Sequence, residues 1–570
     1  MEPPYINFEL KGIPASSGIA IGKAVVLLPE NIVIDTSKIS IDEVVSEQNR
    51  FDTACESLSK EMENLIAAVH TDSKNVIDIL ESNMLILSDP VLKEGIYKRI
   101  ADLSTAENAI VQEFDEQKLL FLSVKDEYLR LRADELEHIK KRLIYILRHK
   151  LIDYRINENT IVVAQNLTPA DIVNFHNAGI TGMITESGGI VSHVSIMARA
   201  YKIPSVIGFK NITSVIHTGD EIIIDGFSGS LIINPNKAFI DDYHKKQAKI
   251  AEYHKKLGKL KDVECKTLDG VSIKIYVNID LREDAIAGEI AGADGVGLVR
   301  SESLIMKSGG MPNLEMQEQW YKDLVNITFP KPLTIRGFDI GSDKFSEGLP
   351  HQEDNPALGC RGIRFLLLRK DIFRTQIIAV LKASVNKNVK FMLPMISNLQ
   401  EVLEAKSIIA ECKAELDAQG INYDKNMPVG IMVETPAAAL IADCLAKEVD
   451  FMSIGTNDLT SYTIGVDRAN DLVSDIFNPL HPAVFRLIKM TVKAAHKFHI
   501  PLSICGELAA YPEAIPLLIG FGIEELSMSP AMVLEAKNIV INTNKRESMI
   551  FANEMLCITD NIEFLRRLKG

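Results

Sequence analysis

The sequence predicts a multidomain α/β protein, in which an α/β domain with an inserted α-helical domain precedes a C-terminal (β/α)8 TIM-like barrel. Three observations support this fold class. The length of 570 residues suggests three or four domains. Strand-like segments lie on both sides of a long helical region in the N-terminal half of the chain. Strands and helices then alternate from about residue 263 to the C-terminus.

The α/β domain is predicted to be discontinuous. Residues 8–34 alternate small, glycine and β-branched residues, which is typical of short strands joined by tight turns. Strand-like segments return at residues 160–233, again with glycine-rich turns between them. We therefore assign residues 1–34 and 149–235 to one domain and residues 35–148 to an insert within it.

The insert is predicted to be helical. Apolar residues between positions 42 and 70 recur at spacings of three, four or seven, which marks one face of an amphipathic helix. Ser88-Asp89-Pro90 is typical of a helix start, and residues 119–149 are again helical and highly charged. Residues 35–150 hold 23 acidic and 16 basic residues, about half of the net charge of −15. We interpret most of these charges as solvated helix faces, with a docking surface for a basic partner as the sharper hypothesis.

The second half of the chain carries the barrel pattern. A lysine-rich segment, residues 236–262, is predicted to be a solvated linker helix. Residues 263–570 contain eight candidate strands, and helical patterns fill most gaps between them, which predicts a (β/α)8 barrel. The longest gap, residues 338–388, is expected on the functional face. The candidate strands are 272–278, 295–300, 332–337, 389–395, 429–434, 451–455, 500–505 and 524–528.

Composition excludes several classes of protein. Hydrophobic residues make up 46% of the chain and charged residues 24%, which is ordinary globular composition. The acidic balance argues against general nucleic-acid binding, which needs a basic surface. Seven scattered cysteines without a CxxC pair indicate a reducing compartment rather than a disulfide framework or a zinc site. With no signal-peptide pattern and no run of 18 apolar residues, the sequence predicts a soluble cytoplasmic protein without membrane contact.

The barrel hypothesis makes a testable demand, because catalytic residues should lie at the C-terminal ends of the strands. Arginine forks match phosphate and carboxylate oxygens, and two carboxylates with substrate oxygens suit Mg²⁺. Any single arginine could instead form a surface salt bridge, but the whole set falls at one end of one predicted barrel. It therefore predicts a site for a phosphorylated acid and one metal ion. The set comprises four arginines, two carboxylates, an amide and a thiol: Arg300, Arg336, Arg361, Arg468, Glu434, Asp458, Asn457 and Cys505.

A second cluster, GGIVSHVSIMAR at residues 188–199, lies in the α/β domain. Ser192 and His193 open a predicted helix after two glycines. A histidine at a helix N-terminus can hold a phosphoryl group near exposed N–H donors, and a neutral imidazole nitrogen is a competent nucleophile. A structural or capping role is the usual explanation for a lone histidine, but the length of this motif favours the nucleophile.

These motifs make the chain resemble a known family, the phosphoenolpyruvate–protein phosphotransferases, or enzyme I of the bacterial sugar phosphotransferase system. The resemblance covers essentially the whole chain, and the last four of its segments are long and specific. The matching segments are GIPASSGIAIGKA, LTPAD and GGIVSHVSIMAR in the first half, and GLVRSE, DIGSDK, NPALGCRGIR, GIMVETPAA, SIGTNDLTSYTIGVDR and CGELA in the barrel.

The resemblance implies a role for each candidate residue. His193 would be the phosphorylated nucleophile, reacting at Nε2, with Thr168 holding its other ring nitrogen. Cys505 would protonate the enolate. Glu434 and Asp458 would bind Mg²⁺. Arg300 and Arg336 would bind the phosphoryl group of phosphoenolpyruvate, and Asn457 and Arg468 would also contact this substrate. Arg361 and Asp458 are assigned to substrate binding because they lie at the same end of the predicted barrel.

The resemblance also implies partners and domain roles. The interrupted domain would be a swivelling phosphohistidine domain, and the insert would dock the small carrier protein HPr. The barrel, residues 263–570, would bind phosphoenolpyruvate and form a homodimer. The phosphohistidine domain would swing between the barrel and HPr, with the linker as pivot.

Several positions depart from the family pattern. The departures leave every proposed catalytic and binding residue in place and alter supporting groups, so they bear on rate, partner choice and regulation. They lie beside the active histidine, after the second strand and after CGELA: Ile190, Val191, Val194, Ser303, Ala510 and Tyr511.

Three alternatives follow. Pyruvate phosphate dikinase and phosphoenolpyruvate synthase share the histidine domain and the barrel, but they need an ATP-binding domain for which residues 1–150 offer no glycine-rich nucleotide loop. The chain could also be a nitrogen-type paralogue. The altered supporting residues motivate the third alternative, a regulatory phosphocarrier or scaffold with reduced catalysis.

Overall fold

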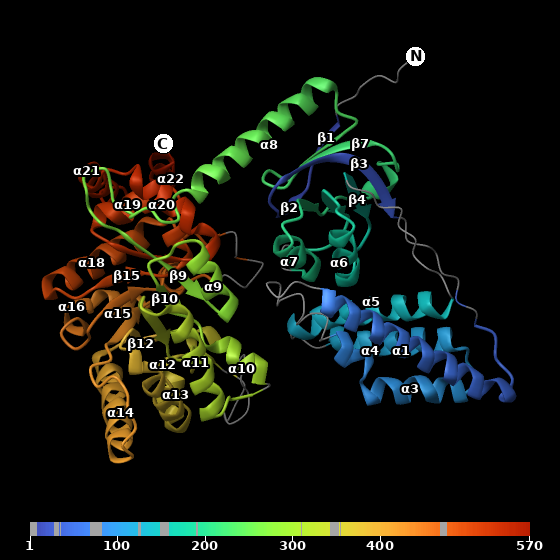
Figure 1. Cartoon of the computed structure of the whole chain (residues 1–570), viewed down its shortest axis with the longest axis horizontal. Helices are drawn as coiled ribbons and strands as arrows, with labels where there is room; N and C mark the ends of the chain where they lie inside the picture. Colours follow the sequence, from blue (N-terminus) through green and yellow to red (C-terminus); the bar gives the residue numbers. More distant parts are fainter. Residues whose placement is uncertain are drawn as a thin grey trace. The chain divides into compact units, whose positions relative to one another are not determined.

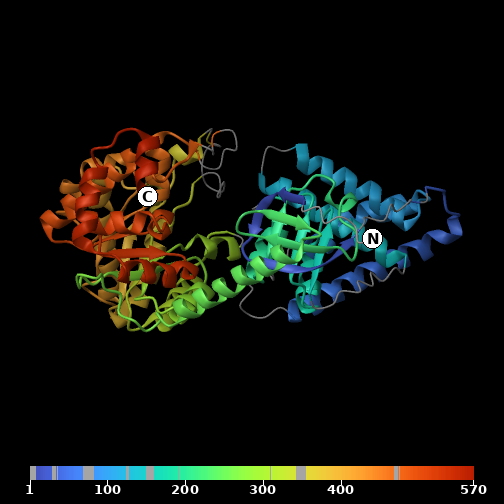
Figure 2. The ribbon, with the colours of Figure 1, turned by 90° about the horizontal axis from the view of Figure 1, so that it is seen from above.

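The computed structural model describes residues 8–27, 34, 36–68, 83–123, 127–148, 159–189, 192–308, 310–341, 353, 355–467, 473 and 476–569. The chain divides into two compact units, Met1–Ala251 and Glu252–Gly570. Figures 1 and 2 show the first unit in blue to green and the second in green to red.

The first unit contains an eight-stranded sheet with the order β1-β8-β7-β3-β4-β5-β6-β2. Strand β3 pairs in parallel with β4, across the insert, and antiparallel with β7. The strands before and after the insert therefore share one sheet, as the sequence predicted. Their bounds are β1 Phe8–Lys11, β2 Ile13–Ser16, β3 Ile19–Leu27, β4 Thr160–Ala164, β5 Gly182–Thr185, β6 Ser205–Ile207, β7 Glu221–Asp225 and β8 Ser230–Ile233.

Isoleucine-rich and valine-rich runs form this sheet because β-branched side chains pack well on a pleated surface. One face of the sheet is covered by helices α6 (Pro169–Asn177) and α7 (His193–Ala200) (Figure 1). Phe175 of α6 and Met197 of α7 are buried against Val162 and Met183 of the strands. Both helices are thereby fixed at the same side of the sheet.

The insert consists of helices α1 (Val44–Ala68), α3 (Pro90–Ala101), α4 (Ala106–Ser123) and α5 (Glu127–Leu147). Asp89 caps α3 by accepting a hydrogen bond from the N–H of Val91, which confirms the helix start predicted from the sequence. The helices share a core of their own, which includes Phe51, Ile96, Ile110, Phe114 and Leu143.

The predicted linker segment forms helix α8 (Lys237–Gly258), and the division between the units falls inside it. In its first half, Tyr243 packs against Ile223 and Ile232 of the sheet. In its second half, Leu257 is buried within the second unit. The helix therefore belongs to both units.

The second unit is a closed barrel of eight parallel strands, in which β16 pairs with β9 to complete the ring. All eight strands predicted from the sequence are confirmed, with ends that differ by two residues or fewer. They are β9 Lys274–Ile279, β10 Val296–Val299, β11 Leu333–Arg336, β12 Val389–Leu393, β13 Val429–Val433, β14 Met452–Ile454, β15 Leu502–Ile504 and β16 Glu525–Met528.

The barrel helices are α9 Arg282–Ile290, α10 Glu302–Ser308, α11 Leu314–Thr328, α12 Ile363–Leu368, α13 Lys370–Ala383, α14 Leu399–Ala418, α15 Pro436–Leu440, α16 Ala442–Leu445, α17 Thr456–Ile464, α18 Pro482–Phe498, α19 Ala514–Phe521, α20 Val533–Ile541, α21 Lys545–Met555 and α22 Asn561–Leu568. Phe485 of α18 lies against Phe521 of α19 and Phe564 of α22, so that aromatic rings join the last helices to the wall. Among the described residues, no helix combines the length and hydropathy that crossing a membrane would require.

Candidate active site

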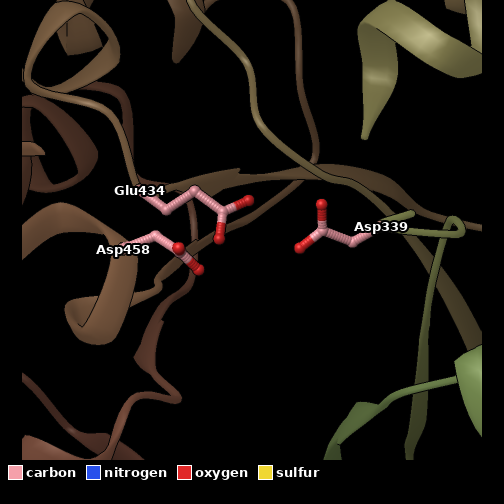
Figure 3. A group of neighbouring side chains, drawn as sticks. All are labelled: Asp339, Glu434 and Asp458. Atoms are coloured by element: carbon pink, nitrogen blue, oxygen red, sulfur yellow. The ribbon is translucent and has the colours of Figure 1, made fainter. Parts of the chain in front are cut away.

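Three carboxylates meet at the C-terminal ends of the barrel strands. Asp339 follows β11, Glu434 comes directly after β13, and Asp458 lies in the first turn of α17, after β14. Each offers an oxygen within 4.8 Å of the others, and Figure 3 shows the three groups turned toward one another. The sequence predicted Glu434 and Asp458 at this end of the barrel, but it did not single out Asp339.

Glu434 is the most deeply buried of the three, with 1% of its surface exposed. Burial, followed by the charges of Asp339 and Asp458, raises its pKa to about 8. Its Oε1 accepts a hydrogen bond of 2.6 Å from the backbone N–H of Met395. The carboxyl therefore keeps its proton at neutral pH until a cation compensates the charge.

Arg336, the last residue of β11, is held between two carboxylates. Its Nη1 lies 3.1 Å from Oδ2 of Asp339, and its Nη2 lies 3.1 Å from Oε1 of Glu302. Its Nε is buried and has no acceptor within the described part of the chain. The cation is therefore held through both terminal nitrogens, while its Nε lacks a partner among the described residues.

Arg361, in the loop before α12, shares Asp339 with Arg336. Its Nε and Nη2 donate to the two oxygens of Asp339 at 3.1 and 2.7 Å. Its Nη1 lies 3.3 Å from Oδ1 of Asp458 and 3.4 Å from the hydroxyl of Tyr462. The negative charges around Arg336 and Arg361 keep the pKa of both guanidinium groups above its usual range despite their burial.

The other predicted binding residues differ in their positions. Arg300 follows β10 and is half-exposed, with Nη1 3.5 Å from Oδ2 of Asp280. Asn457 directly precedes Asp458 in the first turn of α17, and it exchanges two hydrogen bonds with Glu507, at 2.9 and 3.1 Å. Arg468 lies outside the described residues.

Cys505 follows β15 and is 2% exposed, at the inner wall of the barrel with Met392 and Met432. Burial raises the pKa of its thiol to about 11, and a hydrogen bond with Ser453 partly opposes that shift. The thiol is therefore protonated at neutral pH and can act as an acid. Asn278 holds the backbone carbonyl of Cys505 through Nδ2 at 2.8 Å.

A buried polar network lies behind Arg336, and no pattern in the sequence predicted it. The side-chain oxygen of Gln376 on α13 accepts from the N–H of Phe338, and its NH₂ donates to Tyr321 on α11 and to Ser301. Ser301 in turn donates to the backbone carbonyl of Arg336 at 3.0 Å. Gln376 and Ser301 are fully buried, so the network fixes the strand end that carries Arg336.

His193 is the first residue of α7, and Ser192 is its N-cap, accepting a hydrogen bond from the N–H of Ser195. The predicted helix start is thereby confirmed, whereas the neighbours Ile190 and Val191 lie outside the described residues. Thr168 caps α6: its Oγ1 accepts from the N–H of Asp171, and its own N–H donates to the Asp171 carboxylate. The role assigned to Thr168 toward His193 stays a prediction.

The residues that depart from the family pattern, where the structure describes them, pack against a core or form a local hydrogen bond. Val194 packs against the core between the sheet of the first unit and helices α6 and α7. The hydroxyl of Ser303 donates to the backbone carbonyl of Asp280, the residue whose carboxylate faces Arg300. Ala510 and Tyr511 pack against the barrel core.

Three family models match the chain. They describe the PEP-binding domain of PEP-utilising enzymes at residues 254–545, the N-terminal part of these enzymes at residues 11–132, and their mobile domain at residues 156–229. The three matched ranges do not overlap. The match at residues 254–545 contains all eight barrel strands and all three carboxylates of the site.

Curated relatives cover nearly the whole chain. The chain is similar to a phosphoenolpyruvate-protein phosphotransferase of Haemophilus influenzae, with 39% identity over 96% of each chain. It is similar to the protein of that name from Listeria innocua, with 38% identity over 96% of each chain. A Priestia megaterium protein of the same name shares 37% identity over 99% of each chain.

Proposed function

Because the chain belongs to the phosphoenolpyruvate-protein phosphotransferases, within the PEP-utilising enzymes, we propose that it transfers the phosphoryl group of phosphoenolpyruvate to its own His193. A histidine of an HPr-type carrier protein then accepts that group, and pyruvate is released. The observation that carries this proposal is the placement of the buried Arg336, the half-buried Arg361 and three carboxylates at one end of the barrel.

The residues at the barrel rim suit the binding of a phosphorylated acid. Arg336 and Arg361 are charged, held in fixed orientations and placed beside one another through Asp339. Arg300, Asn457 and Arg468 complete the proposed binding set. Phosphoryl transfer depends mainly on positioning and on charge stabilisation, which fixed cations provide without reorganisation.

The carboxylates fit Mg²⁺, because this ion prefers hard oxygen ligands and uses few protein groups. Glu434 and Asp458 would hold it. When bound, the ion would neutralise charge on the phosphoryl and enolate oxygens. Asp458 also pairs with Arg361, so it would join the metal site to the anion-binding groups.

Cys505 is proposed to complete the conversion to pyruvate. Departure of the phosphoryl group leaves an enolate, whose methylene carbon must gain a proton. The neutral thiol gives its proton to that carbon and becomes a thiolate, which Ser453 can stabilise as a hydrogen-bond donor.

The partners are proposed from family membership. The helical insert would dock the carrier protein, and the barrel would mediate a homodimer. We propose a cytoplasmic location, which the seven free cysteines fit.

Phosphate transfer tests the function directly. Purified chain with labelled phosphoenolpyruvate and Mg²⁺ should acquire acid-labile phosphate and pass it to HPr. His193→Ala should lose the label, whereas the matched variant at an exposed histidine, His217→Ala, should keep it. Absence of label on the unmodified chain would refute the proposal.

A further inference from the structure

We propose that Asp339 is a positioning residue that fixes Arg336 and Arg361 for the substrate, rather than a ligand of the metal ion. The inference rests on the proposed function, since it concerns how the same site grips a phosphorylated acid. Of the three neighbouring carboxylates in Figure 3, Asp339 would position the arginines, and Glu434 and Asp458 would hold the metal ion.

Asp339 contacts both arginines directly. Its side chain is 3% exposed and lies between the two guanidinium groups. Oδ1 accepts from Nε of Arg361, and Oδ2 accepts from Nη2 of Arg361 and lies 3.1 Å from Nη1 of Arg336. The backbone N–H of Asp339 donates to Oε1 of Glu302, the carboxylate that also holds Arg336. Asp339 is thus fixed from both ends.

Asp339 differs from Glu434 and Asp458 in how many of its carboxylate oxygens accept hydrogen bonds. Both of its oxygens accept charge-assisted hydrogen bonds, and Oδ2 faces two cations at once. Within the described residues, the hydrogen bonds of Glu434 and Asp458 each engage one carboxylate oxygen, Oε1 and Oδ1 respectively. The second oxygen of each remains for a hard cation, whereas recruitment of Asp339 would break the contacts that hold the arginines.

The shared carboxylate also holds Arg336 and Arg361 in place. Two cations side by side repel one another, and the shared carboxylate offsets that repulsion. Both terminal nitrogens of Arg336 are anchored, one by Asp339 and one by Glu302, so that its unpaired Nε is held in one direction. Preorganised donors of this kind bind an anion without the entropy loss of ordering two long side chains.

The test separates binding of substrate from binding of metal. Asp339→Asn removes the charge at nearly constant shape, and the full chain carries His193→Ala in addition so that phosphoenolpyruvate is not consumed. Calorimetry with phosphoenolpyruvate and Mg²⁺ should show affinity weakened by about tenfold to a hundredfold. Mn²⁺ alone, followed by electron paramagnetic resonance, should lose much less affinity than it does in Asp458→Asn, because Asp339 acts on the ion only through its charge. Asp458→Asn is the matched control and should weaken Mn²⁺ binding itself.

Two outcomes overturn the inference: Asp339→Asn binds phosphoenolpyruvate as tightly as the parent, or it loses Mn²⁺ affinity as Asp458→Asn does. Asp339→Glu keeps the charge and displaces it by one methylene, so it should weaken phosphoenolpyruvate binding in the same way if Asp339→Asn does not fold. Failure of the His193→Ala parent to bind phosphoenolpyruvate would instead refute the proposed function.

Discussion

Metal binding at the barrel rim should release a proton from Glu434. With a pKa of about 8, this carboxyl is about 10% ionised at pH 7 and about 90% ionised at pH 9. A cation that binds the carboxylate must displace the proton, so the affinity for the metal should fall as the pH falls through 8. The expected change is about tenfold between pH 9 and pH 7, or about 1.4 kcal/mol.

Calorimetric titration of the substrate-free chain with Mn²⁺, in buffers of different ionisation enthalpy, counts the released protons. We expect about 0.9 proton at pH 7 and about 0.1 at pH 9. Glu434→Gln has no proton to release and provides the control, since any remaining release would come from another group. Equal affinity at pH 7 and pH 9, with no proton released at pH 7, would refute the assignment of Glu434 as a buried, protonated ligand.

Three further predictions follow from burial and hydrogen bonding. Gln376→Leu leaves the N–H of Phe338 without its acceptor and should destabilise the barrel by about 2–4 kcal/mol, measured by urea unfolding. Cys505→Ala should slow pyruvate formation, measured by stopped flow, by about 10²–10⁴-fold. Its affinity for phosphoenolpyruvate, measured by calorimetry, should stay within about twofold. An unchanged rate would exclude the thiol as the acid. Phe485→Ala should cost about 3–5 kcal/mol of unfolding free energy, whereas Met490→Ala on the exposed side of the same helix should cost less than about 0.5 kcal/mol.

The barrel could be predicted from the sequence because each strand is a short apolar run between turn residues, and strand ends mark where functional groups gather. Glu434 and Cys505, which directly follow their strands, were therefore placed correctly. The start of the helix at His193 was equally clear, because Ser192 supplies the cap.

Asp339 and Gln376 could not be found in the same way. The side-chain partners of Asp339 lie 3 and 22 residues away in the chain, and those of Gln376 lie 38 to 75 residues away. No periodicity marks such contacts, because they depend on how neighbouring βα units pack. The pKa of Glu434 has the same origin, since desolvation is a property of the folded site.

The parallel pairing of β3 with β4 has a consequence for protein engineering. Parallel neighbours need a crossover connection, and here the entire helical insert provides it between Leu27 and Thr160. The register places Thr160, where β4 begins, beside Lys23, four residues before β3 ends at Leu27. Along the strand direction, the connection therefore returns over about four residues, roughly 13 Å. The insert is therefore an exchangeable cassette: a crossover of about a dozen residues could replace it, or the insert of a relative could be grafted, with the strand order of the sheet retained.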